Sequence, residues 1–135
     1  MRLSFEITLG LAAKRVGKSA KLARRLFFDA EMGDLEVKKW TRGFYDDSRV
    51  TIDLQDLAKR LPSGDAPPKT TLPCLVVGAT DDKIVDREGV EEMADFFKTK
   101  AEWVESPHDV MLGGRWENGA YCLLQWLENL EGVGD

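Results

Sequence analysis

The sequence has few of the side chains that hold metals or cross-link small folds. Its 135 residues include a single histidine, His108, and two cysteines, Cys74 and Cys122. Because a zinc site needs several histidine or cysteine ligands at close spacing, we expect no metal and no cofactor. Both cysteines lie among apolar residues, which predicts buried thiols rather than a disulfide framework and favours a reducing, intracellular compartment.

Long apolar runs and an excess of positive charge are missing as well. No apolar run approaches the roughly 18 residues that a membrane-spanning helix needs, so we expect no membrane span. The net charge of −5 argues against a general nucleic-acid binder. A hydrophobic content of 43% with 32% charged residues is typical of a soluble globular chain, long enough for one domain with a core.

Residues 1–61 are predicted to form a helical segment. Apolar residues recur at helical spacing from Leu22 to Phe27, from Leu35 to Tyr45 and from Ile52 to Leu61. These spacings predict three helices, the second from about Asp34 to Asp46 and the third ending before Pro62.

The start of the chain leaves two alternatives open. Apolar residues alternate strictly from Leu3 to Leu11, which favours a strand, although Leu3, Ile7 and Leu11 also share one helical face. The first 28 residues are rich in basic side chains: Arg2, Lys14, Arg15, Lys18, Lys21, Arg24 and Arg25. We interpret them as the basic face of a solvated helix, with a targeting or membrane-surface segment as the alternative.

Residues 62–69 are predicted as a linker, because the stretch from Pro62 to Pro68 is rich in proline and holds no apolar residue larger than alanine. Residues 70–135 then read as strand, helix, strand, helix. The expected elements run from Leu72 to Val77, Asp86 to Lys100, Ala101 to Glu105 and Trp116 to Leu130, with Asp86 as the N-cap. The first strand is apolar throughout, as expected for a parallel strand buried on both faces. The last helix is amphipathic and should pack on a sheet face.

Asp82 and His108 each follow one of these two strands. A right-handed crossover places both strands parallel and adjacent, so the loops that follow them meet at one sheet edge. We therefore expect Asp82 to orient the imidazole of His108 for proton transfer. Asp81 competes for this role, whereas Asp109 is expected to solvate or cap.

These residues resemble the last part of an α/β-hydrolase. The run from Gly78 to Val85 is similar to that family's G-x-x-x-D-x-I-V loop with the triad acid, matched by Asp82. The run from His108 to Leu112 is similar to its H-x-x-M-L loop with the triad histidine. The resemblance covers residues 68–130 well and residues 1–67 more loosely, as a helical cap.

The resemblance implies an α/β fold, a partial α/β-hydrolase with a helical cap segment and a C-terminal β-α-β-α unit that carries the last two parallel strands. It favours a helix for the start of the chain. It also implies that Trp40, Phe44 and Tyr45 could line a substrate pocket, although ordinary helix packing explains such aromatics as well. The compartment it suggests is the cytoplasm or the chloroplast.

The family's nucleophile elbow, G-x-S-x-G, is missing from this sequence. The serines present lack the strand, sharp turn and helix that expose a nucleophile: Ser4, Ser19, Ser48, Ser63 and Ser106. We therefore expect a fragment that carries the acid and the histidine of an esterase-like catalytic triad and is not catalytic alone. It would act on a small-molecule substrate only if completed by the missing N-terminal half.

Two alternatives stay open. An aspartate nucleophile would place the chain in the epoxide-hydrolase or dehalogenase branch of the same fold. A parallel two-stranded sheet is also too small to be stable alone, so the chain could instead be a non-catalytic interaction module that docks or self-associates through its open strand edge.

Overall fold

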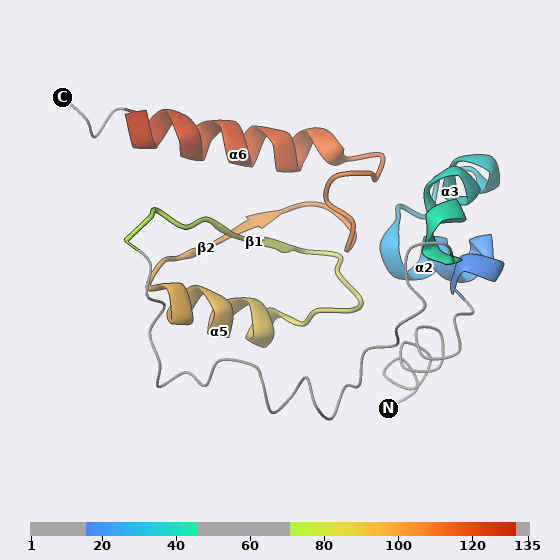
Figure 1. The fold of residues 1–135 in the computed structure, drawn as a ribbon, viewed down its shortest axis with the longest axis horizontal. Helices are drawn as coiled ribbons and strands as arrows, with labels where there is room; N and C mark the ends of the chain where they lie inside the picture. The colour runs from blue at the N-terminus through green and yellow to red at the C-terminus, as the bar shows by residue number, and fades with distance from the viewer. Residues whose placement is uncertain (1–15, 46–70, 132–135) are drawn as a thin grey trace.

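The computed structural model describes residues 16–45 and 71–131 (Figure 1). Within these residues the fold is mixed α/β, with four α-helices and a sheet of two parallel strands. The predicted helix from Ile52 to Leu61, the alternating stretch from Leu3 to Leu11 and the linker at 62–69 lie outside the described residues. None of the described helices has the length and apolar character that crossing a membrane requires.

The helical segment begins with a 3-10 turn, η1 (Val16–Lys18), and helix α2 (Ala20–Phe27). Ser19 caps α2, because its hydroxyl accepts a hydrogen bond of 3.2 Å from the Leu22 amide. Ala23 and Leu26 are fully buried on one face of this helix, as their spacing predicts.

Helix α3 (Asp34–Thr41) packs against α2 and carries acidic residues in its first turn and lysines in its last, which suits the helix dipole. The predicted helix from about Asp34 to Asp46 is wrong from Arg42 to Tyr45, where a 3-10 turn, η2 (Arg42–Tyr45), follows α3; Asp46 lies outside the described residues. Together these elements enclose a core of six buried residues: Val16, Ala23, Leu26, Phe28, Met32 and Val37.

Strands β1 (Val76–Ala79) and β2 (Ala101–Val104) pair in parallel, with Val76 opposite Ala101 and Ala79 opposite Val104. The predicted first strand, Leu72 to Val77, therefore starts too early. Because β2 begins only at Ala101, the residues before Val76 have no partner strand. Val76 and Val77 are half-buried rather than buried on both faces, since no further strand flanks β1 in the described chain.

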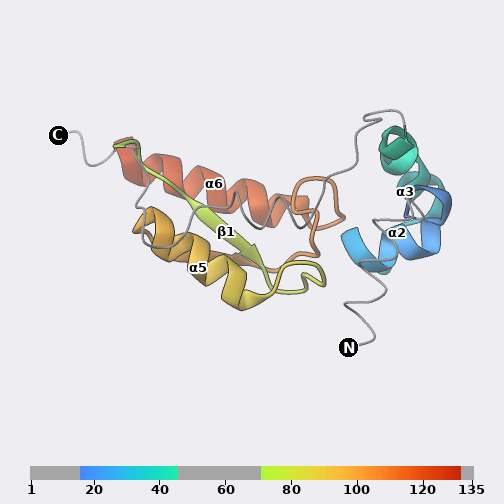
Figure 2. The ribbon, with the colours of Figure 1, turned by 60° about the horizontal axis from the view of Figure 1, so that its bottom comes forward.

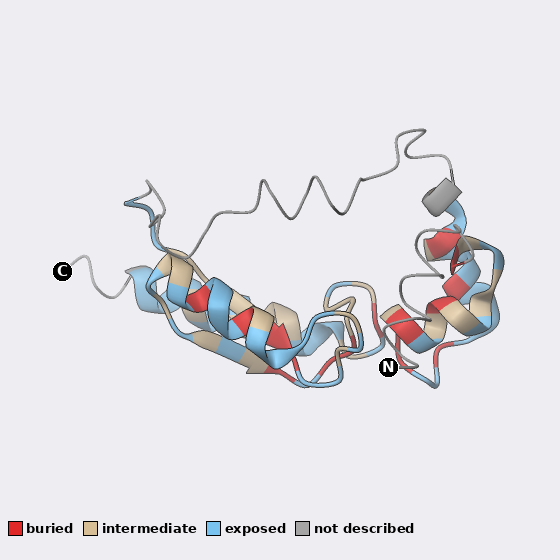
Figure 3. Cartoon of the chain, turned by 90° about the horizontal axis from the view of Figure 1, so that it is seen from below, coloured by how far each residue is buried: buried red, intermediate tan, exposed pale blue. Residues whose placement is uncertain are grey.

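Helix α5 (Arg87–Phe97) makes the crossover between the strands, and Val90 and Ala94 are its buried residues. Asp86 is the N-cap as predicted, because its carboxylate accepts a hydrogen bond of 2.9 Å from the Gly89 amide. Figure 3 shows that buried residues gather in the helical segment and along α5.

Helix α6 (Trp116–Glu131) lies on the opposite side of the strands from α5 (Figure 1). The prediction that its apolar face packs on the sheet is wrong for most of that face, because the leucines of the stripe are exposed, Leu124 by 57%. The reason is size: a helix of 16 residues is about 24 Å long and overhangs two short strands. Its less exposed residues are Gly119, Ala120, Cys122 and Trp126.

Both cysteines are free thiols, but each is only half-buried, so the expectation of buried thiols is wrong. Cys74 precedes β1, where no strand pairs with the chain, and Cys122 lies on the incompletely covered helix α6. Partial burial raises the pKa of the Cys122 thiol, and the negative charge of Glu102 raises it further.

Candidate functional site at the strand ends

The loops that follow β1 and β2 lie side by side. The Thr80 amide donates a hydrogen bond of 2.9 Å to the Val104 carbonyl, and the Asp81 amide donates one of 3.1 Å to the Ser106 carbonyl. These two bonds extend the parallel pairing past the strands. The first residues of both loops are therefore held together.

This arrangement brings Asp82 and His108 into contact, as the topology predicts. The Nδ1 atom of His108 lies 2.9 Å from Oδ2 and 3.0 Å from Oδ1 of Asp82. The side chain of Asp82 is 10% exposed and that of His108 is 30% exposed. The acid is thus shielded from water while the imidazole remains accessible.

The Asp82 carboxylate is itself held by the loop that carries it. Its Oδ1 accepts hydrogen bonds of 2.8 Å from the Ile84 amide and 3.1 Å from the Val85 amide. This local turn fixes the direction of the carboxylate before it meets the histidine. Asp82 therefore serves both as an anchor of the loop and as the partner of Nδ1.

The two competing acids have other partners. Asp81 bonds to Arg115 with its Oδ2 2.7 Å from Nη2. Asp109 accepts hydrogen bonds from the Met111 and Leu112 amides, which is the capping role expected for it. Of these three acids, only Asp82 has a hydrogen bond to His108 among the described residues.

An apolar groove of about 790 Å³ borders His108. The ring of Phe27 meets the imidazole edge-on, with 5.4 Å between ring centroids. The walls come from the end of α2, the start of the sheet, the 108–111 loop and α6: Phe27, Leu75, Val77, His108, Asp109, Val110, Met111, Trp116, Gly119, Ala120 and Leu123. Such a groove suits an apolar group placed beside one polar side chain.

The loop that carries His108 is packed tightly on both sides. The Asp109 amide donates a hydrogen bond of 2.9 Å to the Phe27 carbonyl. On the other side, Val110 lies so close to Gly119 of α6 that a Cβ there would be 2.4 Å from Val110 Cγ1. Gly119 is therefore required for α6 to approach this loop.

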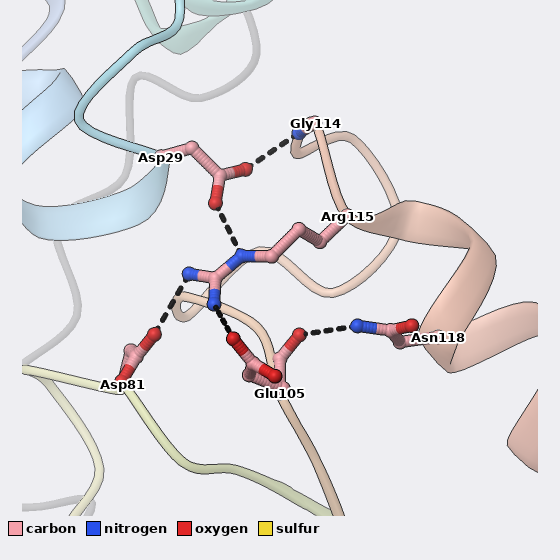
Figure 4. A network of polar contacts seen from close by, with 6 residues as sticks. All are labelled: Asp29, Asp81, Glu105, Gly114, Arg115 and Asn118. Atoms are coloured by element: carbon pink, nitrogen blue, oxygen red, sulfur yellow. Dashed lines mark hydrogen bonds and ion pairs between the residues drawn. The ribbon is translucent and has the colours of Figure 1, made fainter.

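Arg115 forms a polar network at the same edge that the sequence did not predict (Figure 4). Its Nε donates to Asp29 at 2.7 Å, its Nη2 to Asp81 at 2.7 Å and its Nη1 to Glu105 at 3.1 Å. Asp29 also accepts a hydrogen bond of 2.6 Å from the Gly114 amide. Hydrogen bonds to Asp81 and Asp29 raise the pKa of the Arg115 guanidinium, so the cation is stabilised there.

The sequence held little that could have revealed this network. Its three acids come from the helical segment and from two different loops, and no spacing rule links them. Together these contacts join the helical segment to the strand ends, and Figure 2 shows α2 on the side of these loops.

No described serine is placed as a nucleophile beside His108. The hydroxyl of Ser19 caps α2, and Ser106 is completely buried with no hydrogen-bond partner for its hydroxyl. Ser4, Ser48 and Ser63 lie outside the described residues. The site therefore presents a carboxylate and an imidazole, and neither of the two described serines is placed to act with them.

Of the three aromatic residues expected to line a pocket, Trp40 packs against the core of the helical segment. It lines neither this groove nor a second cavity of about 830 Å³, which lies between the helical segment and the strand ends and is bordered by Asp29, Asp81 and Arg115. The side chains of Phe44 and Tyr45 lie outside the described part of the structure, so their pocket role stays a prediction. The described residues also contain no group of three His, Cys, Asp or Glu side chains that could bind a metal ion.

Comparison of the chain with protein-family models, curated proteins and solved structures found no match.

Proposed function

We propose that this chain is the acid and histidine part of a hydrolase of the α/β-hydrolase type. In this proposal Asp82 and His108 are the second and third members of a catalytic triad, and the helical segment is the remnant of a cap. The nucleophile is supplied by a polypeptide segment that is not part of these 135 residues. Alone, the chain does not catalyse ester hydrolysis.

The observation that carries this proposal is the contact of the Asp82 carboxylate with Nδ1 of His108 at 2.9 Å. A carboxylate on Nδ1 keeps the proton on that nitrogen, which leaves Nε2 free to accept a proton from a nucleophile. His108 also lines the apolar groove, where the acyl or alcohol part of an ester would lie.

The chemistry follows from these two residues. A hydroxyl nucleophile gives its proton to Nε2 as it attacks the ester carbonyl, and Asp82 stabilises the resulting imidazolium. His108 then returns the proton to the leaving alcohol. An aspartate nucleophile would make His108 activate a water instead, as in the epoxide-hydrolase and dehalogenase branches.

A phosphonate probe that reacts with activated serines tests the first proposal. We expect the chain of 135 residues to remain unlabelled, because none of its serines lies in a nucleophile-elbow motif, and the two described serines are a helix cap and a buried hydroxyl. The His108→Ala variant is the matched control for background reaction. Labelling of one serine that disappears in this variant would show a complete triad and contradict the proposal.

The exposed apolar face of α6 favours a second candidate, an interaction module. Tyr121, Leu123, Leu124, Leu127 and Leu130 are all exposed, and each described strand has an unpaired edge. Such a surface would be covered by a partner chain or by a second copy. This candidate predicts association in solution, whereas a monomer at all concentrations with cooperative unfolding would count against it.

A further inference from the structure

The network around Arg115 joins parts of the chain that are far apart in sequence. Asp29 comes directly after the end of α2, whereas Asp81 and Glu105 belong to the loops that follow β1 and β2. The three acids differ in exposure: their side chains are 8%, 53% and 76% exposed, respectively. Of the three acids only Asp29 is shielded from water, and its pair with Arg115 is the one that reaches the helical segment.

We propose that Arg115 is a positioning residue for His108. Its Nε donates a hydrogen bond to the carboxylate of Asp29, and this contact holds the ring of Phe27 against the imidazole. Arg115 does not touch the imidazole itself; it acts through the short stretch from Phe27 to Asp29.

Two backbone amides of the loop that follows His108 anchor this stretch. The Phe27 carbonyl accepts a hydrogen bond of 2.9 Å from the Asp109 amide, directly after the histidine. The Asp29 carboxylate accepts one of 2.6 Å from the Gly114 amide, next to Arg115. Both amides belong to the loop that carries His108. Loss of the contact at Asp29 should therefore also weaken the hydrogen bond between Phe27 and Asp109, which places the Phe27 ring.

The environment of the imidazole is then set by two contacts. Asp82 holds Nδ1, and Phe27 meets the ring at an interplanar angle of 69°. One contact fixes the ring by a hydrogen bond and the other limits its rotation. The catalytic meaning of this inference rests on the proposed function, but the arrangement itself does not.

Nuclear magnetic resonance tests the inference directly, because His108 is the only histidine and its ring signals are unambiguous. The Phe27 ring shifts the imidazole proton signals, and Phe27→Leu provides the reference for loss of that ring. In Asp29→Asn the side chain keeps its size but loses the negative charge that pairs with Arg115. We expect its His108 signals to move most of the way to those of Phe27→Leu.

Glu105→Gln is the matched control, because it removes an exposed partner of Arg115 that does not belong to the helical segment. We expect its His108 signals to stay at the native positions. Folding of each variant is checked by the amide signals of β1 and β2. A folded Asp29→Asn with native His108 signals would overturn the inference.

A second measurement on the unaltered chain covers the case in which Asp29→Asn does not fold. Native-state hydrogen exchange of the Asp109 and Gly114 amides should report one shared opening free energy, because both amides bond to the same stretch. A lower opening free energy at Asp109, with Gly114 still protected, would show that Phe27 moves independently of the pair of Asp29 with Arg115 and would overturn the inference. Labelling of a serine by the phosphonate probe would contradict the proposed function but would not bear on the role of Arg115. The proposed function and this inference can therefore fail separately.

Discussion

The Nδ1 atom of His108 lies 2.9 Å from Oδ2 of Asp82, although 26 positions separate the two residues in the sequence. The parallel pairing of β1 with β2 closes this separation, because each residue follows the end of one strand. The contact therefore depends on the sheet as well as on the two side chains. Changes in either loop test it.

The turn from Asp82 to Val85 should depend on the side-chain acceptor of Asp82. Asp82→Ala removes the acceptor for the Ile84 and Val85 amides, so the free energy of unfolding should fall by about 1–3 kcal/mol. Asp82→Asn keeps an amide oxygen in that place and should cost less. Urea unfolding of both variants measures the difference, and equal losses would show that the turn does not depend on the acceptor.

Gly119→Ala should destabilise the chain, although alanine favours helices over glycine. The new Cβ would be 2.4 Å from Val110 Cγ1, so α6 or the histidine loop must shift, at a cost of about 1–3 kcal/mol. Adding Val110→Ala makes room and should recover part of the loss in thermal unfolding. Gly33→Ala is the control, because nothing lies within 4 Å of its new Cβ.

The thiol of Cys122 should react slowly in the folded chain. Burial and the charge of Glu102 raise its pKa, so less thiolate is present at about pH 8.5, where an unperturbed cysteine is half ionised. Because this pKa is raised only in the folded chain, the free energy of unfolding should fall as the pH rises above the pKa that Cys122 has in the unfolded chain. Alkylation followed by mass spectrometry should show slower modification of Cys122 in the folded chain than in urea; equal rates would contradict the assignment.

The exposed face of α6 should control association. Leu124→Gln removes an apolar side chain that is exposed in the structure, so it should weaken any self-association without loss of folding. Glu117→Gln, an exposed change in the first turn of the same helix, is the control. Sedimentation at several concentrations measures both; an unchanged association constant for Leu124→Gln would show that this face is not the contact.

The sequence predicted the Asp86 cap and the contact of Asp82 with His108, because local rules and topology agree there. The Asp86 cap set the start of α5, and the order strand, helix, strand brought Asp82 to His108. The start of β1 was missed because the apolar run begins at Leu72, whereas pairing with β2 decides where the strand begins. The hydrophobic pattern alone does not determine the register in which β1 pairs with β2.

Two other features depend on tertiary packing that no local pattern records. The periodicity of α6 shows which residues are apolar, but the width of the sheet decides which of them are covered. Arg115 was missed because its partners, Asp29, Asp81 and Glu105, come from three separate segments.

The tautomer of His108 tests the proposed function most directly, because a triad histidine is held by Asp82 through Nδ1 and has Nε2 free to accept a proton. Nitrogen-15 spectra of the imidazole, recorded at a pH where the ring is neutral, distinguish the two nitrogens without ambiguity in a chain with one histidine. We predict a proton on Nδ1, a bare Nε2, and loss of this preference in Asp82→Ala. A neutral ring with its proton on Nε2 would contradict the central claim, because that nitrogen could no longer act as the base.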